Sequence, residues 1–358
     1  MLPYESMKVL GIETSCDETA ASVVEDGQKL LSNVVASSMD LHVAYGGVVP
    51  EIAARSHLEV INSVVQQALD DAKTDWAGID AIAVTYGPGL GGSLLIGVMT
   101  ARTLAIAKNK PFYAVNHVEA HAYANFLTDT SLTGYQLRSR QPEFPMLALL
   151  VSGKHSEHVL FRSYFDYTML GQTQDDAIGE AFDKVAKMLG LPYPGGPSVG
   201  KKALDGDPFR YELPKAHMGK YDFSFSGLKT AVLRLAQTEI GEDFTFPSKD
   251  LPGRLSERQK ADIAASFQRV AIETLVDKTV TAYEEFAPKS VVIGGGVAAS
   301  AELRRQLAER LPYPIEYPDM KLCTDNGAMV ATIGCFMAKH GQPVADPYTL
   351  DINPSLSM

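Results

Sequence analysis

The stretch KVLGIETSCDETAASVVE, residues 8–25, decides the fold of this chain. Its apolar parts, residues 8–13 and 20–25, flank the polar turn TSCDET, which predicts two strands joined by a tight turn. The same layout returns at Met146, where the apolar run MLALLV, the small-residue turn SGKHS and a second strand-like run, residues 157–162, follow one another. Two strand–turn–strand starts of this kind predict two duplicated α/β halves.

Helical patterns follow each start. Pro50, a residue favoured in the first turn of a helix, precedes apolar residues at the three-four spacing of one helical face, such as Ile61 and Val64. In the second half, Ser256 with Gln259 three residues later is typical of a capping box at the start of a long helix. Because strands alternate with helices, we predict the α/β class, with mainly parallel or mixed sheets covered on both faces.

One change in composition divides the chain. In residues 128–145 apolar side chains give way to Thr, Ser, Gly, Arg, Gln and Pro, and we interpret this segment as a linker between two domains. The predicted first half is 7–130, completed by a C-terminal return segment, 318–345. The predicted second half is 145–317, with helical insertions.

The composition excludes several classes of protein. The chain has 358 residues, of which 46% are hydrophobic and 21% charged, as in folded rather than disordered proteins. Its best apolar run, Met146–Val151, is far shorter than the ~20 residues needed to cross a bilayer. The first residues lack the layout of a signal peptide, and three cysteines are too few for a disulfide framework. We therefore expect a cytoplasmic protein without membrane association.

The charge balance constrains nucleic-acid binding. The chain carries 32 Lys and Arg against 43 Asp and Glu, a net charge of −11. So acidic a chain is not a general nucleic-acid coat, because phosphate binding needs local positive potential. A local patch for a structured RNA stays open, although each basic pair is more simply interpreted as a solvated helix or loop end. The pairs are Arg55 with His57, Lys108 with Lys110, Lys220 with Lys229, and Arg304 with Arg305.

His117 and His121 are four residues apart, a spacing that places both imidazoles on one face of a helix, close enough to bind one metal ion. Two ordinary histidines near a helix start are the alternative. The metalloprotease motif H-E-x-x-H places its glutamate directly after the first histidine, whereas here Val118 follows and Glu119 comes one place late. That glutamate would point about 100° further round the helix, which disfavours a protease of this class.

The segment CTDNGAM, residues 323–329, precedes another predicted helix. Asp325 is a natural N-cap for that helix. A carboxylate from this distant segment could equally complete a site of two histidines and one carboxylate with open coordination positions. The sequence by itself leaves both interpretations open.

A glycine motif follows the strand predicted to end at Tyr86. Gly87, Gly89 and Gly92 match the dinucleotide fingerprint, but Pro88 interrupts it and no acidic residue lies about 20 positions beyond to bind a ribose. We interpret the motif instead as a turn that lets backbone or a partner approach closely. A P-loop is excluded because the string G-x-x-x-x-G-K-[ST] is absent.

Phosphate can also be bound by backbone N–H groups in glycine-containing turns and at helix starts. Three segments suit this role: residues 14–19, 151–156 and 294–300. A hairpin turn in each half and a later glycine triplet are expected of a nucleotide clamped between duplicated domains. Asp183 lies off the apolar face of its predicted helix and points either at such a cleft or at solvent.

Together these motifs resemble one family, the universal tRNA threonylcarbamoyladenosine transferases (TsaD), once labelled O-sialoglycoprotein endopeptidases. The resemblance extends from about Met7 to His340. It rests on VLGIETSCDET, YGGVVPEIAAR, GPGLGGSLL, NHVEAH, LLVSG, DDAIGEAFDK, YPGGP, DFSFSGLKT, IGGGVA and CTDNGAM.

The resemblance implies the actin-like ATPase fold shared with sugar kinases, built from two duplicated RNase H-like halves. It implies that His117, His121 and Asp325 bind one metal ion, iron (Fe2+) or alternatively Zn2+. The family's contacts to the activated substrate and its nucleotide fall on Leu150, Val151, Ser152, Gly153, Lys154, Asp183, Gly196 and Ser300, with Gly294, Gly295 and Gly296 in the nucleotide loop. Two positions depart from the family pattern, because Lys154 stands where a glycine is usual and Ser300 where an asparagine is usual.

The resemblance also implies a reaction. Threonylcarbamoyl-AMP, made by a separate threonylcarbamoyl-AMP synthase, would bind between the halves. The N6 amine of the adenosine 3′ of the anticodon (position 37), in tRNAs reading codons that start with adenine, would attack its carbamoyl carbon, and AMP would leave. We expect N–H groups of Ser152 and Gly153 to hold negative oxygens, and Asp17 or Glu18 to accept the amine proton.

The implied partners are tRNA, a TsaB-like paralogue that forms a heterodimer, and a TsaE-like ATPase through which the complex uses ATP. Two other classes stay open. A small-molecule kinase of the same fold would have no use for the histidine pair. A non-catalytic scaffold paralogue would have no reason to keep the histidines together with the carboxylate of the DNG sequence.

Overall fold

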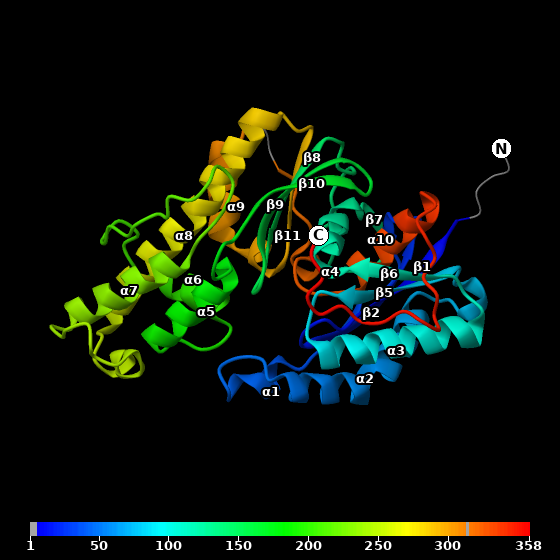
Figure 1. Cartoon of the computed structure of the whole chain (residues 1–358), viewed down its shortest axis with the longest axis horizontal. Coiled ribbons are helices and arrows are strands. Elements are labelled where there is room, and N and C mark those ends of the chain that lie inside the picture. Colours follow the sequence, from blue (N-terminus) through cyan, green and yellow to red (C-terminus); the bar gives the residue numbers. More distant parts are fainter. Residues whose placement is uncertain (1–5, 313–314) are drawn as a thin grey trace. The chain divides into compact units, whose positions relative to one another are not determined.

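The computed structural model describes residues 6–312 and 315–358. Its contacts divide the chain into two compact units (Figure 1). Unit 1 comprises Met1–Pro142 and Glu316–Met358, and unit 2 comprises Glu143–Ile315. The segment predicted as a linker, 128–145, lies mostly in unit 1. There the buried Arg138 donates from Nη1 to the side chain of Asn125 (3.2 Å) and to the carbonyl of Glu316 (2.8 Å).

Unit 1 is built on a mixed sheet of order β6-β5-β1-β2-β3-β7, with β4 paired to β2 (Figure 1). Its strands are β1 (Lys8–Glu13), β2 (Glu18–Glu25), β3 (Lys29–Leu30), β4 (Val34–Ser37), β5 (Ala81–Gly87), β6 (Phe112–Asn116) and β7 (Asp129–Thr130). β1 runs antiparallel to β2 and parallel to β5. The predicted strand–turn–strand unit of residues 8–25 is confirmed, with β2 beginning at Glu18.

Helices cover both faces of this sheet. They are α1 (Met39–Val43), α2 (Pro50–Asp71), α3 (Gly91–Lys108), α4 (His117–Tyr123) and α10 (Gly327–Lys339), with 3-10 turns at Trp76–Gly78, Ala124–Phe126 and Met320–Leu322. Leu10 and Ile12 of β1 pack into a core with α2 and α3. The alternate residue Gly11 faces α10, where a Cβ would lie 2.3 Å from the nitrogen of Ala331. The start of α10 is therefore held tightly against the β1–β2 hairpin.

Unit 2 repeats this strand arrangement in a sheet of order β10-β9-β8-β11. Its strands are β8 (Met146–Val151), β9 (Ser156–Ser163), β10 (Asp166–Gln172) and β11 (Ser290–Gly294). β8 runs antiparallel to β9 and parallel to β11, as β1 does to β2 and β5. The duplication predicted from the two strand–turn–strand starts is thus visible in the strand order.

The helices of unit 2 pack mainly around one long helix, α8. They are α5 (Ile178–Leu189), α6 (Gly195–Ala203), α7 (Ser226–Glu239), α8 (Glu257–Phe286) and α9 (Ala301–Arg310), with 3-10 turns at Ser248–Gly253 and Gly296–Ala299. The predicted capping box is confirmed, because Ser256 and Gln259 bond reciprocally at the start of α8. Helix α5 ends at Leu189, before the segment PYPGGP, and the next helix, α6, begins within that segment at Gly195. No helix within residues 6–312 and 315–358 has the length and apolar character needed to span a membrane.

Candidate metal centre and substrate turns

The two histidines of the predicted metal site lie on α4. Strand β6 leads directly into this helix, and the side chain of Asn116 caps it by accepting from the N–H groups of Val118 (2.9 Å) and Glu119 (3.3 Å). The cap fixes the helix start at His117, so the i, i+4 spacing brings the two rings to a centroid separation of 4.8 Å. Both side chains are buried.

Asp325 completes the group. Of the two interpretations left open for Asp325, the structure does not show the N-cap, because the neighbouring Asn326 caps α10 and accepts from the N–H of Met329 (3.0 Å). Instead, Oδ1 of Asp325 lies 3.6 Å from Nε2 of His117 and 3.3 Å from Nε2 of His121. The ligand atoms of the three residues all lie within 4.8 Å of one another, so the structure brings the three together.

The group suits a metal ion for two reasons. Both ring nitrogens of His121 are buried and have no hydrogen-bond partner, which is costly unless a ligand engages them. Moreover, two ligand atoms each about 2.0–2.2 Å from one ion lie roughly 3–3.6 Å apart at tetrahedral or octahedral angles. The separations of 3.3 and 3.6 Å between the Nε2 atoms and Asp325 meet this requirement.

Glu13 is a site residue that the sequence interpretation missed. It is fully buried at the end of β1, where Oε2 lies 3.1 Å from Nδ1 of His117 and accepts from the hydroxyl of Thr85 (2.6 Å). Burial acts to raise the pKa of Glu13, but His117 outweighs it and holds the pKa below its usual value. A carboxylate on Nδ1 orients the ring so that Nε2 faces Asp325. The available signal was a glutamate that directly follows the apolar run of β1 and precedes a polar turn.

Asp17 and Glu18, predicted as alternative proton acceptors, lie side by side at the start of β2. Burial and the charges of Asp325 and Asp17 raise the pKa of Glu18 to about 9. A metal cation on Asp325 would act in the opposite direction, so Asp17, which is buried, and Glu18 both remain candidates for the acceptor.

Glu119 lies on α4 between the two histidines but is not a member of the ligand group. Its Oε1 is buried without a hydrogen-bond partner, and burial raises the pKa of Glu119 to about 7. Burial and, to a lesser degree, the charge of Glu119 raise the pKa of Tyr86 on β5. This agrees with the absence of the H-E-x-x-H arrangement.

The turn after β8 satisfies most of its own polar groups. The N–H of Ser152, predicted to hold a negative oxygen, donates to the carbonyl of His155 (2.8 Å) and is therefore engaged within the turn. The hydroxyl of Ser152 accepts from the N–H groups of Lys154 (3.2 Å) and His155 (3.1 Å). A Cβ on Gly153 would meet no atom within 4 Å, and the Lys154 side chain is exposed. Gly153 and Lys154 are therefore the accessible members of this turn.

The glycine loop of residues 294–296 lies beside the end of β8. Leu150, a buried residue, pairs in register with Gly294 of β11. Gly295 has φ of +89°, and a Cβ there would lie 2.3 Å from the carbonyl oxygen of Val151. The structure thus brings two of the three predicted phosphate segments, 151–156 and 294–300, together in unit 2, whereas residues 14–19 belong to unit 1.

Ser300 and Asp183 both serve helix starts. Ser300 caps α9 by accepting from the N–H of Leu303 (3.4 Å), a role for which serine and asparagine are about equally suited. Oδ1 of Asp183 accepts from the N–H of Gly195 (2.6 Å), so this carboxylate points at the start of α6 rather than at bulk solvent. Burial raises the pKa of Asp183. Beside it, a Cβ on Gly196 would meet no atom within 4 Å.

The basic pairs considered for RNA binding are largely engaged within the protein. His57 is buried, with Nδ1 2.7 Å from the hydroxyl of Thr19. Lys229 pairs with Asp176 (2.7 Å), and Arg305 pairs with two glutamates of its own helix. These contacts favour the simpler, structural interpretation of the pairs.

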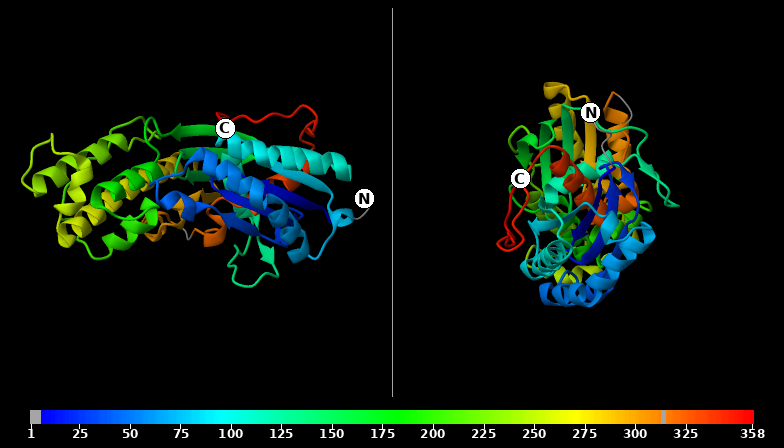
Figure 2. Two further views of the ribbon diagram at one scale, coloured as in Figure 1. Left: turned by 90° about the horizontal axis from the view of Figure 1, so that it is seen from below. Right: turned by 90° about the vertical axis from the view of Figure 1, so that its right-hand side faces the viewer.

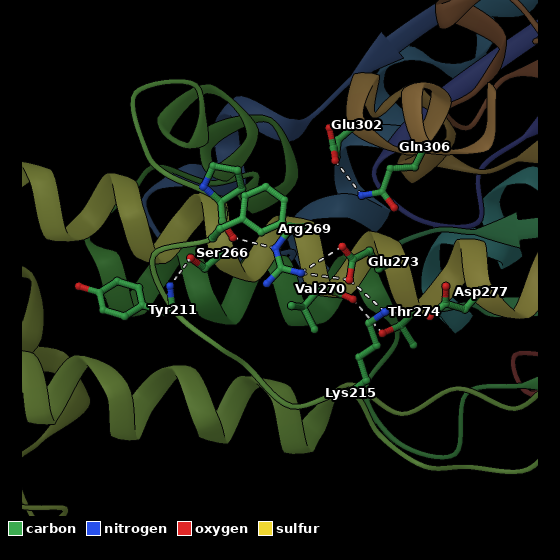
Figure 3. A network of polar contacts seen from close by, with 12 residues as sticks. Tyr211, Lys215, Ser266, Arg269, Val270, Glu273, Thr274, Asp277, Glu302 and Gln306 are labelled. Carbon is green, nitrogen blue, oxygen red and sulfur yellow. Dashed lines mark hydrogen bonds and ion pairs between the residues drawn. The ribbon is translucent and has the colours of Figure 1, made fainter. Parts of the chain in front are cut away.

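A separate cavity of about 590 Å³ lies in unit 2 near α6, α8 and α9. Figure 3 shows the polar network on one side of it, in which Arg269 bonds Glu273 (3.1 Å) on α8 and Glu302 accepts from Gln306 (2.7 Å) on α9. The guanidinium of Arg269 also lies over the ring of Phe209. Glu302 is also paired with Arg305, so charges of both signs in this lining are engaged with one another.

The glycine motif at Gly87 confirms the interpretation of a close backbone approach. A Cβ on Gly87 would lie 2.0 Å from the carbonyl oxygen of Asn353, and a Cβ on Gly89 would lie 2.6 Å from that of Ser15. The approaching backbone belongs to this chain itself, partly to its C-terminal segment.

Comparison with known proteins finds a matching family model and relatives that align with nearly the whole chain. Residues 29–332 match the family model TsaD, described as tRNA N6-adenosine threonylcarbamoyltransferase. A protein of that name from Thermomicrobium roseum is 49% identical over 98% of this chain and 97% of its own length. Another, from Dehalococcoides mccartyi, is 46% identical over 98% of this chain and 99% of its own.

Solved structures confirm the fold class. Full-length HypF matches 94% of this chain and 56% of its own with a TM-score of 0.56 at 13% identity. Component A of (R)-2-hydroxyglutaryl-CoA dehydratase from Acidaminococcus fermentans is 15% identical in sequence. The match covers 93% of this chain and 99% of that protein, with a TM-score of 0.50. At these identities the likeness concerns the fold alone, the actin-like ATPase fold of two related α/β halves.

Proposed function

This chain belongs to the TsaD family of tRNA N6-adenosine threonylcarbamoyltransferases, and from that membership we propose how its residues carry out the reaction. The enzyme transfers a threonylcarbamoyl group to N6 of an adenosine in tRNA, which gives t6A. The alternatives of a small-molecule kinase and a non-catalytic scaffold are not favoured, since the relatives that cover the whole chain bear the transferase name.

His117, His121 and Asp325 hold a single metal ion, iron (Fe2+) or Zn2+. The observation that carries this proposal is His121, whose two ring nitrogens are buried without a hydrogen-bond partner while Nε2 lies 3.3 Å from Asp325. When bound, such an ion supplies Lewis acidity and charge stabilisation to oxygens of the substrate. Glu13 holds Nδ1 of His117 and so keeps Nε2 directed at the ion.

The activated substrate is threonylcarbamoyl-AMP, and the acceptor is the adenosine at position 37, 3′ of the anticodon, in tRNAs that read codons starting with adenine. Its N6 amine attacks the carbamoyl carbon and forms the new C–N bond. The bond from this carbon to the phosphate oxygen breaks, and AMP leaves with the electron pair. Asp17 or Glu18 accepts the proton that N6 releases.

Unit 2 binds the nucleotide part of the substrate. Support comes from the open space at Gly153 and Gly196, into which a ligand can approach the backbone. Lys154 adds a positive charge beside the N–H of Gly153, which suits a phosphate. Leu150, Val151 and the loop of residues 294–296 shape the backbone there, while Asp183 and Ser300 hold the starts of α6 and α9.

The enzyme acts in the cytoplasm with a TsaB-like paralogue as its heterodimer partner. A TsaE-like ATPase accounts for the use of ATP, and a threonylcarbamoyl-AMP synthase supplies the substrate. With a net charge of −11, the chain gains from a second subunit that extends the RNA-binding surface.

The test compares His121→Ala with His217→Ala, an exposed histidine of unit 2 that serves as a matched control. Each purified variant is analysed for bound metal. It is then incubated with unmodified tRNA, threonine, bicarbonate, ATP and the partner enzymes, and the nucleosides are measured by mass spectrometry. His121→Ala should lose its metal and at least 100-fold of t6A formation, roughly the effect of removing a principal charge-stabilising element. Wild-type metal content and t6A formation in this variant would refute the metal proposal.

A further inference from the structure

The C-terminal strap, residues 345–358, runs alongside α3 and across the ends of β5 and β6 (Figure 2, red beside cyan). We propose that this strap is a positioning element for the metal centre: it holds the start of α4, and with it His117, in the orientation that binds the ion. The inference rests on the proposed function in that α4 carries two of the proposed metal ligands.

The strap is attached to the sheet by backbone hydrogen bonds. The N–H of Ala345 donates to the carbonyl of Phe112 on β6 (2.7 Å), and that of Asn353 donates to the carbonyl of Tyr86 on β5 (2.8 Å). Further along, the carbonyl of Pro354 accepts from the N–H of Gly89 (3.2 Å). The strap therefore starts beside the amino end of β6, at Phe112, and reaches the carboxyl end of β5, at Tyr86.

Arg102 of α3 clamps the middle of the strap. Its guanidinium donates to the carbonyls of Pro347, Tyr348 (2.8 Å) and Leu350 (3.0 Å). A planar fork of charged donors on three carbonyls fixes the path of the backbone more strongly than neutral hydrogen bonds would. The clamp thus orders a segment that has no helix or strand of its own.

The first route from the strap to the metal centre passes through Asn116. Its side-chain oxygen caps α4, and its Nδ2 donates to the carbonyl of Ser357 (3.2 Å). One amide group is therefore held from both sides. Because His117 is the next residue, the orientation of this cap sets the orientation of the helix start that carries the first ligand.

The second route passes through the turn at Gly87 and Gly89. The strap lies so close to this turn that a Cβ on Gly87 would meet the carbonyl of Asn353. On the other side of the turn, Leu90 donates its N–H to the carbonyl of Ser15 (2.8 Å). The hydroxyl of Ser15 in turn lies 3.1 Å from Nδ1 of His117. Both routes thus end at His117.

These contacts predict an effect on metal affinity that extends beyond the ligands themselves. Residues that orient a ligand typically change metal affinity by about 10–100-fold when they are replaced. Asn116→Ser is the sharpest variant, because serine retains the capping oxygen but lacks the amide donor to Ser357. Arg102→Ala loosens the strap at a distance and leaves the cap intact.

The experiment measures the Kd for Zn2+ alone, by competition with a chromophoric chelator, in the full chain. Asn116→Ser should raise the Kd about tenfold and Arg102→Ala about threefold. Asn62→Ser and Arg162→Ala are matched controls, since Asn62 is exposed on α2 and Arg162 is exposed on β9, and both should retain the wild-type Kd. Hydrogen–deuterium exchange of residues 117–123 without metal is the second readout and should accelerate at least about threefold in both strap variants.

The outcomes separate the strap from the proposed function. If wild type binds Zn2+ and α4 exchanges faster in both strap variants with a weakened Kd, the inference holds. If both variants keep the wild-type Kd within twofold and the wild-type exchange of α4, the strap does not position the site, whatever the metal does. Should Asn116→Ser fail to fold, Arg102→Ala decides alone. If wild type binds no Zn2+, the metal proposal fails, and unchanged exchange of α4 would overturn the strap as well.

Discussion

The metal centre of unit 1 and the turn after β8 in unit 2 differ in whether their polar atoms have hydrogen-bond partners within the protein. At the metal centre, the two ring nitrogens of His121 are buried and lack a hydrogen-bond partner. In the turn after β8, the N–H and the hydroxyl of Ser152 are both engaged within the turn. The first region is complete only when something from outside engages its side chains, whereas the second holds its own shape.

This difference has an energetic basis. A buried polar group without a partner costs about 1–3 kcal/mol, so a site that retains such groups must recover the cost when its ligand binds. The hydroxyl and N–H of Ser152 carry no such cost, and what the unit 2 turns offer a ligand is space at Gly153 and Gly196 together with backbone. Changes at the metal centre should therefore act mainly on metal affinity, while changes in the unit 2 turns should act weakly and through surface charge.

The largest expected effect comes from Asp325→Asn. The amide keeps the shape of the side chain but removes the only carboxylate of the ligand group, so the affinity for Zn2+ should fall at least about 100-fold. A chelator competition assay measures this directly. The neighbouring Asn326→Ala removes the cap of α10 and should instead lower the free energy of unfolding by about 1 kcal/mol in a denaturant titration. An equal loss of metal affinity in both variants would mean that Asp325 acts only through the start of α10.

A smaller effect is expected from Glu13→Gln. Glutamine retains the volume and can still contact Nδ1 of His117, but it no longer provides the charge that orients the ring, so Zn2+ affinity should fall by about 10–100-fold. Glu25→Gln, at the end of the adjacent strand β2, is the matched control because its partner is Lys29 and not a metal ligand. If both variants bind Zn2+ as wild type does, the contact of Glu13 with His117 has no bearing on the metal.

How far the sequence could predict these regions depended on whether the relevant contact is local. The i, i+4 spacing of His117 and His121 is a local pattern that predicts a shared metal ion, whereas the inclusion of Asp325 came from the resemblance to a known family. The cap of α10 could not be assigned between Asp325 and Asn326 from the sequence, because aspartate and asparagine satisfy the same capping rule. The structure decides for Asn326, since its side chain accepts from Met329.

Contacts between segments that are distant in the sequence could not be predicted from sequence patterns. Glu13 interacts with His117 and Thr85, which come from two other strands or their ends. The register of β1 against β5, together with that of β5 against β6, brings these groups together. The internal bond of Ser152 likewise depends on the path of the turn to His155, which its residue types do not dictate.

The smallest effect is expected from Lys154, the residue that departs from the family pattern in the unit 2 turn. Its side chain is exposed, so its interaction with a phosphate should be worth about 0.2–1 kcal/mol, or up to roughly fivefold in affinity. Lys154→Gln removes the charge and keeps the bulk, while Lys154→Gly also removes the bulk. Titration calorimetry with AMP should give weaker binding by about two- to fivefold in both variants at low salt. Because exposed charges are screened, this difference should vanish near 0.5 M salt. A glycine variant that binds AMP more tightly than the glutamine variant at every salt concentration would show that the bulk of residue 154 opposes the nucleotide, and that charge is not what this turn contributes.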